Sequence, residues 1–292
     1  MYDQILVPID GGGGAEGAIG RALDFARIED ATVHVLHVVD TSPEPPTLTS
    51  VDRTEVRQYS EKRGRDATQR VATQATNHGI ETVRTVAEGI PHRAILDYSR
   101  ENDIDLVVMG THGETGRSES GLGSTTQRVV TFSDVPVLAV RLDTETELSR
   151  DGYTMYNHVV VPTDGSDAAM RAAEHGLEIA ERYGAHVHVV YVVDTTTYGF
   201  QDAPRSIVGL LKRGGERAVN ELAAEARDRN LPVTTDVLRG VPEDEILAYA
   251  TGVDTDVITM GTRGRSAGTE RFLGSTTARL VARAEMAVLT TT

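Results

Sequence analysis

The two halves of this 292-residue chain carry the same sequence pattern in the same order. The run Ile5–Asp10 matches Val159–Asp164, 154 residues further on, and Gly89 matches Gly240, 151 residues further on. The second half is therefore three residues shorter in one connecting segment. Self-similarity of this length predicts two domains with one fold.

The segment between the halves is polar and acidic and has no helical or strand periodicity, which indicates a linker. We therefore expect a first domain at residues 1–142, a linker at 143–156 and a second domain at 157–292. Each domain is long enough to bury a core of its own.

Within each half, short apolar runs alternate with longer amphipathic stretches, a pattern typical of strands followed by helices. Pro91 and Pro242 are expected at the first position of a helix, where a missing N–H is tolerated. The alternation predicts an α/β fold with a doubly wound parallel sheet in each half, which binds ligands beyond the carboxyl ends of its strands. The expected helices cover residues 15–28, 52–78, 167–183 and 206–229, with strands ending at Asp10 and Asp164 and further strands at 82–86 and 233–238.

A glycine-containing segment follows the fourth apolar run of each half. Gly110-Thr-His-Gly113 is followed nine residues later by Gly123-Ser124-Thr125, and Gly261-Thr-Arg-Gly264 is followed in the same way by Gly274-Ser275-Thr276. A glycine loop between a strand and a helix start exposes backbone N–H groups and the positive end of the helix dipole. The repeated motif predicts two phosphate-binding sites.

The chain is acidic, with 44 Asp and Glu residues against 29 Lys and Arg residues and a net charge of −15. This charge disfavours nucleic acid as a partner, because it repels the phosphate backbone. Lysine occurs only at positions 62 and 212. Many carboxylates with few lysines resemble proteins of salt-loving archaea, and we expect a halophilic, haloarchaeal origin; a GC-rich genome is the alternative explanation.

Nothing in the sequence indicates a membrane or an oxidising compartment. No apolar run approaches the roughly 20 residues of a membrane span. The amino terminus lacks the basic region of a signal peptide and reads as a strand. Cysteine is absent, which excludes disulfides and thiolate metal sites. We therefore expect a cytoplasmic protein without membrane partners.

Both halves resemble domains of the universal stress protein family, in several motifs that follow one another in the same order twice. The motifs are Pro-x-Asp after the first strand, His-Val-Val-Asp or Tyr-Val-Val-Asp at the end of the second, Gly-x-Pro before the third helix, and Met-Gly after the fourth strand. Both glycine loops match the spacing G-x2-G-x9-G-[ST] of the family's ATP-binding subgroup. The resemblance covers nearly all of both halves and identifies the chain as a tandem, two-domain member.

The resemblance implies a Rossmann-like strand order of 3-2-1-4-5 and an adenine nucleotide, ATP, bound across the carboxyl edge of the sheet, with Mg²⁺ carried by its phosphates. It also implies pairing through the fifth strand, so the two halves are expected to form a pseudo-dimer and the chain a homodimer. The implied role is a nucleotide-dependent signalling module in a stress response, whose protein partner the sequence does not identify.

The resemblance also assigns the site residues, one set in each half. The adenine and ribose are expected beside Pro8, Asp10 and Val38 in the first half and beside Pro162, Thr163, Asp164 and Val192 in the second; Met109 and Met260 are expected to wall the pockets; and the phosphates are expected at Gly110, Gly113, Gly123, Ser124 and Thr125, and at Gly261, Arg263, Gly264, Gly274, Ser275 and Thr276.

Several of these residues have an alternative, purely structural interpretation. Asp10, Asp164, Ser124 and Ser275 each precede or begin an expected helix, where Asp and Ser are good N-caps. His112 stands where the second half has Arg263, which predicts a weaker or pH-dependent phosphate contact in the first half. Arg117, Arg265 and Arg271 are further arginines near the loops. His186 and His188 share one strand face, but no third ligand is evident and no metal site is expected.

Other functions stay open. The run Gly12, Gly14 and Gly17 satisfies G-x-G-x-x-G with Asp40 about 20 residues further on, which is a dinucleotide-binding pattern of the NAD type. An enzyme that hydrolyses ATP slowly or phosphorylates itself is a second alternative, although no catalytic residue stands out and none is predicted. A protein that binds a partner without nucleotide is a third.

Overall fold

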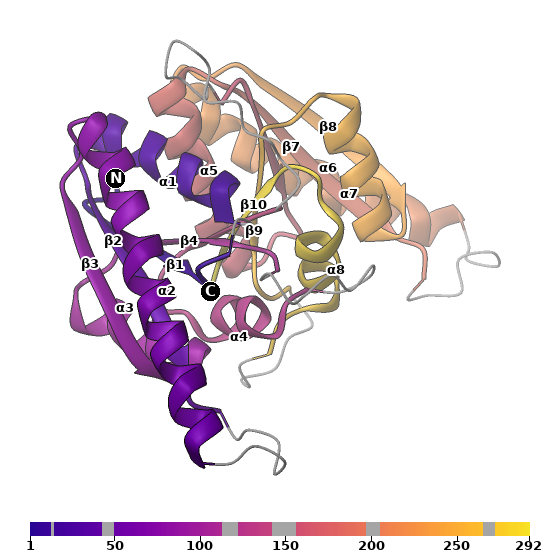
Figure 1. The fold of residues 1–292 in the computed structure, drawn as a ribbon. Helices are drawn as coiled ribbons and strands as arrows, with labels where there is room; N and C mark the ends of the chain where they lie inside the picture. Colours follow the sequence, from indigo (N-terminus) through magenta and orange to yellow (C-terminus); the bar gives the residue numbers. More distant parts are fainter. Residues whose placement is uncertain (13–14, 43–49, 113–121, 142–155, 197–204, 265–271) are drawn as a thin grey trace. The chain divides into compact units, whose positions relative to one another are not determined.

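The computed structural model describes residues 1–12, 15–42, 50–112, 122–141, 156–196, 205–264 and 272–292 (Figure 1). The chain divides into two compact units, Met1–Thr154 and Met155–Thr292.

The first unit is a five-stranded parallel sheet in the order β3-β2-β1-β4-β5. Its strands and helices alternate along the chain, as the sequence predicts. In order they are β1 (Gln4–Ile9), α1 (Glu16–Glu29), β2 (Thr32–Asp40), α2 (Ser50–Asn77), β3 (Thr82–Gly89), α3 (Pro91–Glu101), β4 (Leu106–Gly110), α4 (Ser124–Phe132) and β5 (Val137–Val140).

The second unit repeats this arrangement, with the parallel strand order β8-β7-β6-β9-β10. The implied order 3-2-1-4-5 is therefore confirmed in both units. Its elements are β6 (His158–Pro162), α5 (Asp167–Tyr183), β7 (His186–Asp194), α6 (Arg205–Asp228), β8 (Val233–Gly240), α7 (Pro242–Gly252), β9 (Val257–Gly261), α8 (Ser275–Arg283) and β10 (Ala287–Thr291).

The central strands are apolar at successive positions because helices cover both faces of each sheet. Ile5, Leu6 and Val7 of β1 are at most 1% exposed, although neighbouring side chains point to opposite faces. Right-handed crossovers place α1 and α2 on one face and α3 and α4 on the other. The sheet is a buried layer between two helical layers, which is why its strands lack polar alternation.

The expected element boundaries agree closely with the structure. α5 covers the predicted residues 167–183, and Pro91 and Pro242 begin α3 and α7. β3 runs three residues beyond its predicted end, because its pairing with β2 continues to the pair Asp40–Gly89. No helix among the described residues is long and apolar enough to cross a membrane.

The strand order places the glycine loops of each unit at a crevice. β1 and β4 are neighbours, but their crossover helices lie on opposite faces, so the chain leaves their carboxyl ends in opposite directions. The turn after β1 and the loop after β4 border this crevice, as do the turn after β6 and the loop after β9 in the second unit.

Candidate functional site

The turn after the first strand of each unit is held by an aspartate. Asp10 Oδ1 accepts a hydrogen bond from the Gly12 N–H at 2.9 Å, and Asp164 Oδ1 accepts one from the Ser166 N–H at 2.9 Å. The residue between each pair, Gly11 or Gly165, has a φ of +81° or +75° and requires glycine.

Neither aspartate caps a helix. The N-cap of α1 is Ala15, and that of α5 is Ser166, whose Oγ accepts a hydrogen bond from the Ala169 N–H. Capping, one of the two interpretations left open for Asp10 and Asp164, is therefore wrong. The carboxylates shape the turns that border the crevice.

The glycine loops after β4 and β9 are closed by the same backbone bonds. The Gly123 N–H donates to the Thr111 carbonyl at 2.9 Å, and the Gly274 N–H donates to the Thr262 carbonyl at 2.8 Å. Close packing keeps both positions small, because a Cβ on Gly123 would lie 3.1 Å from the Thr111 oxygen.

Threonine hydroxyls fasten the other end of each loop. Thr126 Oγ1 donates to the Gly110 carbonyl at 2.8 Å, and Thr277 Oγ1 donates to the Gly261 carbonyl at 2.9 Å. The helix after each loop is thus tied to the end of the strand before it. The two units build this connection in the same way.

The helices that follow the loops begin without a side-chain cap. Gly123 and Gly274 are the N-caps of α4 and α8, and neither helix has a capping hydrogen bond from a side chain. Ser124 and Ser275 are the first helical residues rather than the caps, so the capping interpretation is wrong for them too.

The first-turn N–H groups are left for another acceptor. The first backbone bonds of the helices run from Gln127 to Gly123 and from Ala278 to Gly274. The preceding amides, those of residues 124–126 and 275–277, have no acceptor among the described residues; a helix start of this kind attracts anions.

In the second unit the glycine loop contacts the turn after β6. A Cβ on Gly264 would lie 2.7 Å from Asp164 Oδ2, and a Cβ on Gly261 would lie 2.9 Å from the Ala168 carbonyl carbon. The predicted adenine–ribose residue Asp164 and the predicted phosphate residue Gly264 are therefore adjacent. In the first unit Gly113 lies outside the described residues.

The other predicted residues lie at the same carboxyl edge. β2 pairs with β1 as far as His37, so Val38 lies one residue beyond the end of that pairing. β7 pairs with β6 as far as Val190, so Val192 lies two residues beyond it. On the other side, the pairing of β2 with β3 and of β7 with β8 continues past both valines. Met109, Met260 and Thr163 are buried. Pro8 is the next-to-last residue of β1 and so lies at the same edge. Pro162 is buried, Thr163 Oγ1 accepts from the Gly165 N–H, and Thr125 and Thr276 are half-buried in the first helical turns.

The two loops differ in their charged residue. His112 Nδ1 lies 3.1 Å from Thr111 Oγ1, whereas Arg263 is half-buried in the matching place. Arg117, Arg265 and Arg271 lie outside the described residues.

The structure adds one cation that sequence reasoning missed. Arg63 Nε on α2 donates to the Gly11 carbonyl at 3.1 Å, so this side chain lies across the turn after β1. The matching residue of α6 is Gly214, where an added Cβ would meet no atom within 4 Å. The correspondence of Arg63 and Gly214 follows from the glycines next to them, Gly64 and Gly215. Gly64 packs α2 against the His37 ring, and Gly215 packs α6 against the Tyr191 ring.

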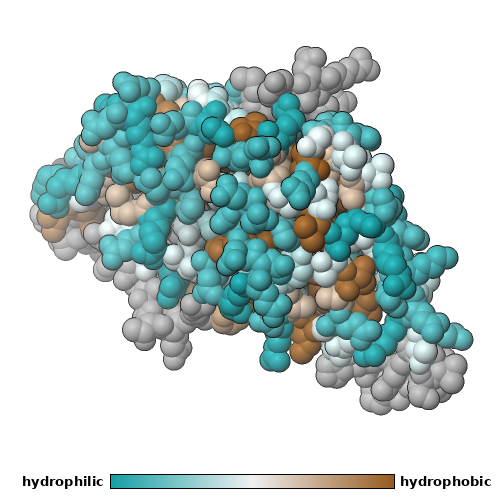
Figure 2. Space-filling model, turned by 90° about the vertical axis from the view of Figure 1, so that its left-hand side faces the viewer, coloured by the Kyte–Doolittle hydropathy of each residue, from teal (hydrophilic) through white to brown (hydrophobic). Residues whose placement is uncertain are grey.

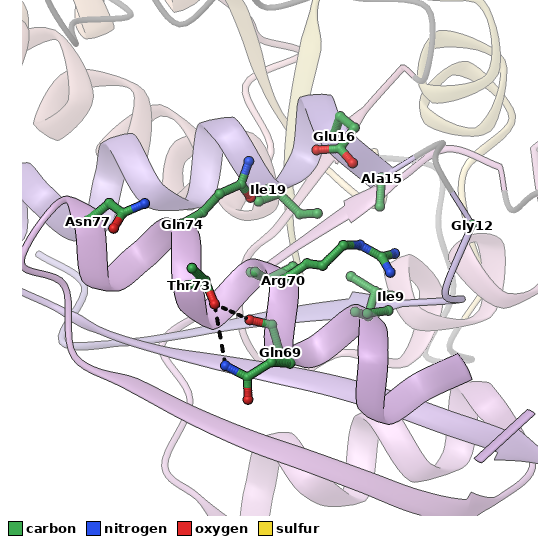
Figure 3. A pocket seen from close by; sticks show the side chains of 12 residues that line it. Ile9, Gly12, Ala15, Glu16, Ile19, Gln69, Arg70, Thr73, Gln74 and Asn77 are labelled. Carbon is green, nitrogen blue, oxygen red and sulfur yellow. Dashed lines mark hydrogen bonds between the residues drawn. The ribbon is translucent and has the colours of Figure 1, made fainter. Parts of the chain in front are cut away.

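A cavity of about 370 Å³ lies between α1 and α2 of the first unit (Figure 3). Its lining includes Ile9, Ile19 and Val71, with Arg70 and Glu16 at the end near Gly12.

In the second unit Arg229, the residue after α6, is joined to α5 through a 2.6 Å ion pair with Glu174. This pair holds the pKa of the Glu174 carboxyl below its usual value.

Two of the three glycines of the dinucleotide pattern lie among the described residues. The Gly12 N–H is bonded to Asp10, and Gly17 lies inside α1. Gly14 lies outside the described residues, and Asp40, at the end of β2, accepts a hydrogen bond from the Ser42 N–H. Among the residues that the structure describes, no group of three or more His, Asp or Glu side chains is placed to hold a metal ion.

These features define a class: a tandem α/β protein in which each doubly wound sheet carries an uncapped helix start at its crevice. Residues 1–141 and 155–291 each match the universal stress protein family. The chain therefore belongs to this family, as the motifs predict.

Known relatives agree with the duplication. The universal stress protein MJ0531 of Methanocaldococcus jannaschii is 36% identical over 157 residues, which is 52% of this chain and 92% of the relative. YxiE of Bacillus subtilis is 30% identical over 152 residues, 48% of this chain and 100% of the relative. A universal stress protein from Archaeoglobus fulgidus has the same fold over 99% of this chain and 97% of its own, with a TM-score of 0.72 and 21% identity.

Proposed function

We propose that the chain binds ATP at the carboxyl edge of each sheet and acts as a nucleotide-dependent module of the stress response. The observation that carries this proposal is the pair of uncapped helix starts, at α4 and α8, each tied to a glycine loop beside an aspartate turn. The NAD-type alternative has less support: α1 also begins without a side-chain cap, but the pattern of Gly12, Gly14 and Gly17 occurs in the first half alone.

The phosphates are assigned to the open amides. Each helix start offers three N–H groups and the positive end of a helix dipole, and hydrogen bonds to a charged group contribute about 1.5–3 kcal/mol each. With burial of a purine, three such bonds are compatible with micromolar affinity, about 8 kcal/mol. Mg²⁺ would be carried by the phosphates.

The nucleoside is assigned to the other side of the crevice. The backbone of Val38 or Val192 extends beyond its neighbouring strand and can hold the edge of the adenine. The carboxylates of Asp10 and Asp164 suit ribose hydroxyls rather than phosphates, since like charges repel. Met109 and Met260 supply apolar walls.

The direct test is mass spectrometry of small molecules released from the purified protein, with calorimetric titration of ATP. An adenine nucleotide released at up to two per chain supports the proposal. The absence of released nucleotide together with no heat on titration rules it out. Radiolabelled ATP turnover in the same preparation distinguishes binding from the slow-ATPase alternative.

A sharper test deletes single N–H groups without disturbing the helices. Gly123 and Gly274 have φ and ψ near −58° and 140°, which is the conformation favoured before proline, and proline is tolerated as the first helical residue. We expect Ser124→Pro and Ser275→Pro each to weaken ATP binding at their own site about tenfold to a hundredfold. The melting temperature without ATP should stay unchanged.

Ser124→Ala and Ser275→Ala are the matched controls, because they keep the N–H and remove only the hydroxyl. Equal loss of affinity in the proline and alanine variants would assign the contact to the side chain. Unchanged affinity in both proline variants would contradict the assignment of phosphate to these helix starts.

A further inference from the structure

A cluster of ionisable side chains lies at the amino-terminal edge of the second sheet, opposite the glycine loops. It comprises His158 at the start of β6, His186 and His188 on β7, Asp236 on β8, and Tyr249 on α7. The sequence shows the two β7 histidines on one face, but only the fold adds the other three.

Hydrogen bonds link four of these side chains into a chain. The Tyr249 hydroxyl donates to Asp236 Oδ2 at 2.9 Å, His188 Nδ1 lies 3.2 Å from that hydroxyl, and His188 Nε2 lies 3.0 Å from His158 Nδ1. Because the Tyr249 proton points to the carboxylate, its oxygen must accept from the His188 Nδ1–H. His188 Nε2 is then an acceptor, and the His158 Nδ1–H donates to it.

The bond between His158 Nδ1 and His188 Nε2 holds one hydrogen, so one of the two nitrogens must accept. When both rings are protonated, both nitrogens are donors, and two donors 3.0 Å apart cannot share a hydrogen bond. A proton added to His158 Nε2 keeps the bond but charges the neighbour of His188. The pair can therefore take one proton without loss and breaks when it takes the second.

The third histidine adds to the electrostatic cost. The His186 ring lies 4.6 Å from that of His188 and 6.0 Å from that of His158, and His186 Nε2 bonds Thr234 Oγ1. Burial, and then the charges of His186 and His158, lower the pKa of His188 to about 4, against the opposite effect of Asp236. At the same edge, the backbone N–H of His158 donates a hydrogen bond to the carboxylate of Asp256.

The first unit carries the same network without the conflict. The counterparts of His158, His188, Tyr249 and Asp236 are Gln4, His34, Tyr98 and Thr85. His34 Nε2 lies 2.8 Å from Gln4 Oε1, His34 Nδ1 lies 2.9 Å from the Tyr98 hydroxyl, and that hydroxyl lies 3.2 Å from Thr85 Oγ1.

Protonated His34 keeps both of these bonds. Its Nε2–H continues to donate to the Gln4 carbonyl, and its Nδ1–H donates to Tyr98 once the phenol proton turns to Thr85. The counterpart of His186 is Thr32, so no second ring is stacked on His34. Burial lowers the pKa of His34 as it does that of His188, but only the second unit places two imidazoles at one hydrogen bond.

We propose that the Asp236–Tyr249–His188–His158 chain is an acid-sensitive device of the second unit, in which the second proton breaks the His158–His188 bond and loosens the starts of β6 and β7. The pKa of a free histidine is about 6.5. Below that pH the unfolded second unit binds more protons than the folded one. Its contribution to stability is therefore complete above pH 6.5 and is lost as the pH falls towards 4.

The test exchanges the two versions of the network in the full chain. His158→Gln places the first unit's acceptor beside His188 Nε2, and we expect the NMR-titrated pKa of His188 to rise by about one unit or more. The fall in melting temperature of the second unit between pH 7 and pH 5 should become smaller. Gln4→His is the converse: it should lower the pKa of His34 and make the first unit more acid-sensitive.

A second variant guards against misfolding of His158→Gln. His186→Thr removes one stacked ring and leaves the four-residue chain intact, so it should shift the His188 pKa upward by a smaller amount. The proposal is overturned if both variants titrate and melt in parallel with the wild-type protein across this pH range. It is also overturned if Gln4→His leaves the first unit unchanged. ATP binding is not part of any of these readouts.

Discussion

At the scale of single residues, position relative to a helix start decides what a polar side chain does. Ser166 and Ser124 both stand at such starts, but Ser166 is an N-cap that accepts from the Ala169 N–H, whereas Ser124 is the first helical residue. The same amino acid closes one helix start and leaves the other open. A sequence pattern does not distinguish these positions, because they differ by one residue.

Ser166→Ala should therefore lower stability while Ser124→Ala should not. Loss of the cap is expected to cost about 1 kcal/mol, and to lower the melting temperature of the second unit by a few degrees. Differential scanning calorimetry without ATP measures both variants. A stability loss of equal size in Ser124→Ala would show that its hydroxyl caps α4 after all.

At the scale of elements, the two units differ most in the helix after the second strand. Arg63 of α2 lies across the Gly11 turn, whereas the matching residue of α6, Gly214, has no side chain to do so. The loop cation also differs, with His112 in the first unit and Arg263 in the second. If the turns border the nucleotide, as proposed, the second unit holds it more tightly.

Changing Arg63, or its counterpart Gly214, should make the two nucleotide sites more alike. We expect calorimetric titration to show two unequal ATP sites, with Arg63→Ala strengthening the weaker one by up to about tenfold, because no hydrogen bond to Gly11 must be broken first. Gly214→Arg should weaken the tighter site. A loss of affinity in Arg63→Ala would show instead that this cation contacts the phosphates.

At the scale of the whole molecule, the net charge of −15 dominates the surface. Hydrophilic side chains cover most of the face shown in Figure 2, with hydrophobic ones scattered among them. Repulsion among carboxylates opposes the compact state, and at about 1 M salt it is screened beyond about 3 Å. This charge pattern is the basis of the proposed halophilic origin.

The melting temperature should therefore rise when KCl is increased from about 0.1 M to about 2 M at pH 7. The same increase at pH 5, near the isoelectric point of about 5.0, should have a smaller effect because less repulsion remains to be screened. An equal rise at both pH values would point to a general salt effect on hydrophobic burial.

The duplication and the strand–helix alternation predicted a parallel α/β sheet in each half, and the family resemblance added the strand order. Buried parallel strands need continuous apolar runs, and helices need a periodic stripe, so both leave a local record in the sequence. The motifs at Asp10, Gly110 and Gly123 likewise predicted which segments meet, because the carboxyl ends of neighbouring parallel strands share one edge.

Only the tertiary structure decided the contacts between residues far apart in the chain. Asp10 shapes a turn instead of capping α1, Arg63 reaches the Gly11 carbonyl from the next helix, and His158 completes a hydrogen-bonded chain with residues of three other elements. Such contacts depend on crossover geometry and side-chain length. Neither is encoded in the local periodicity from which strands and helices are read.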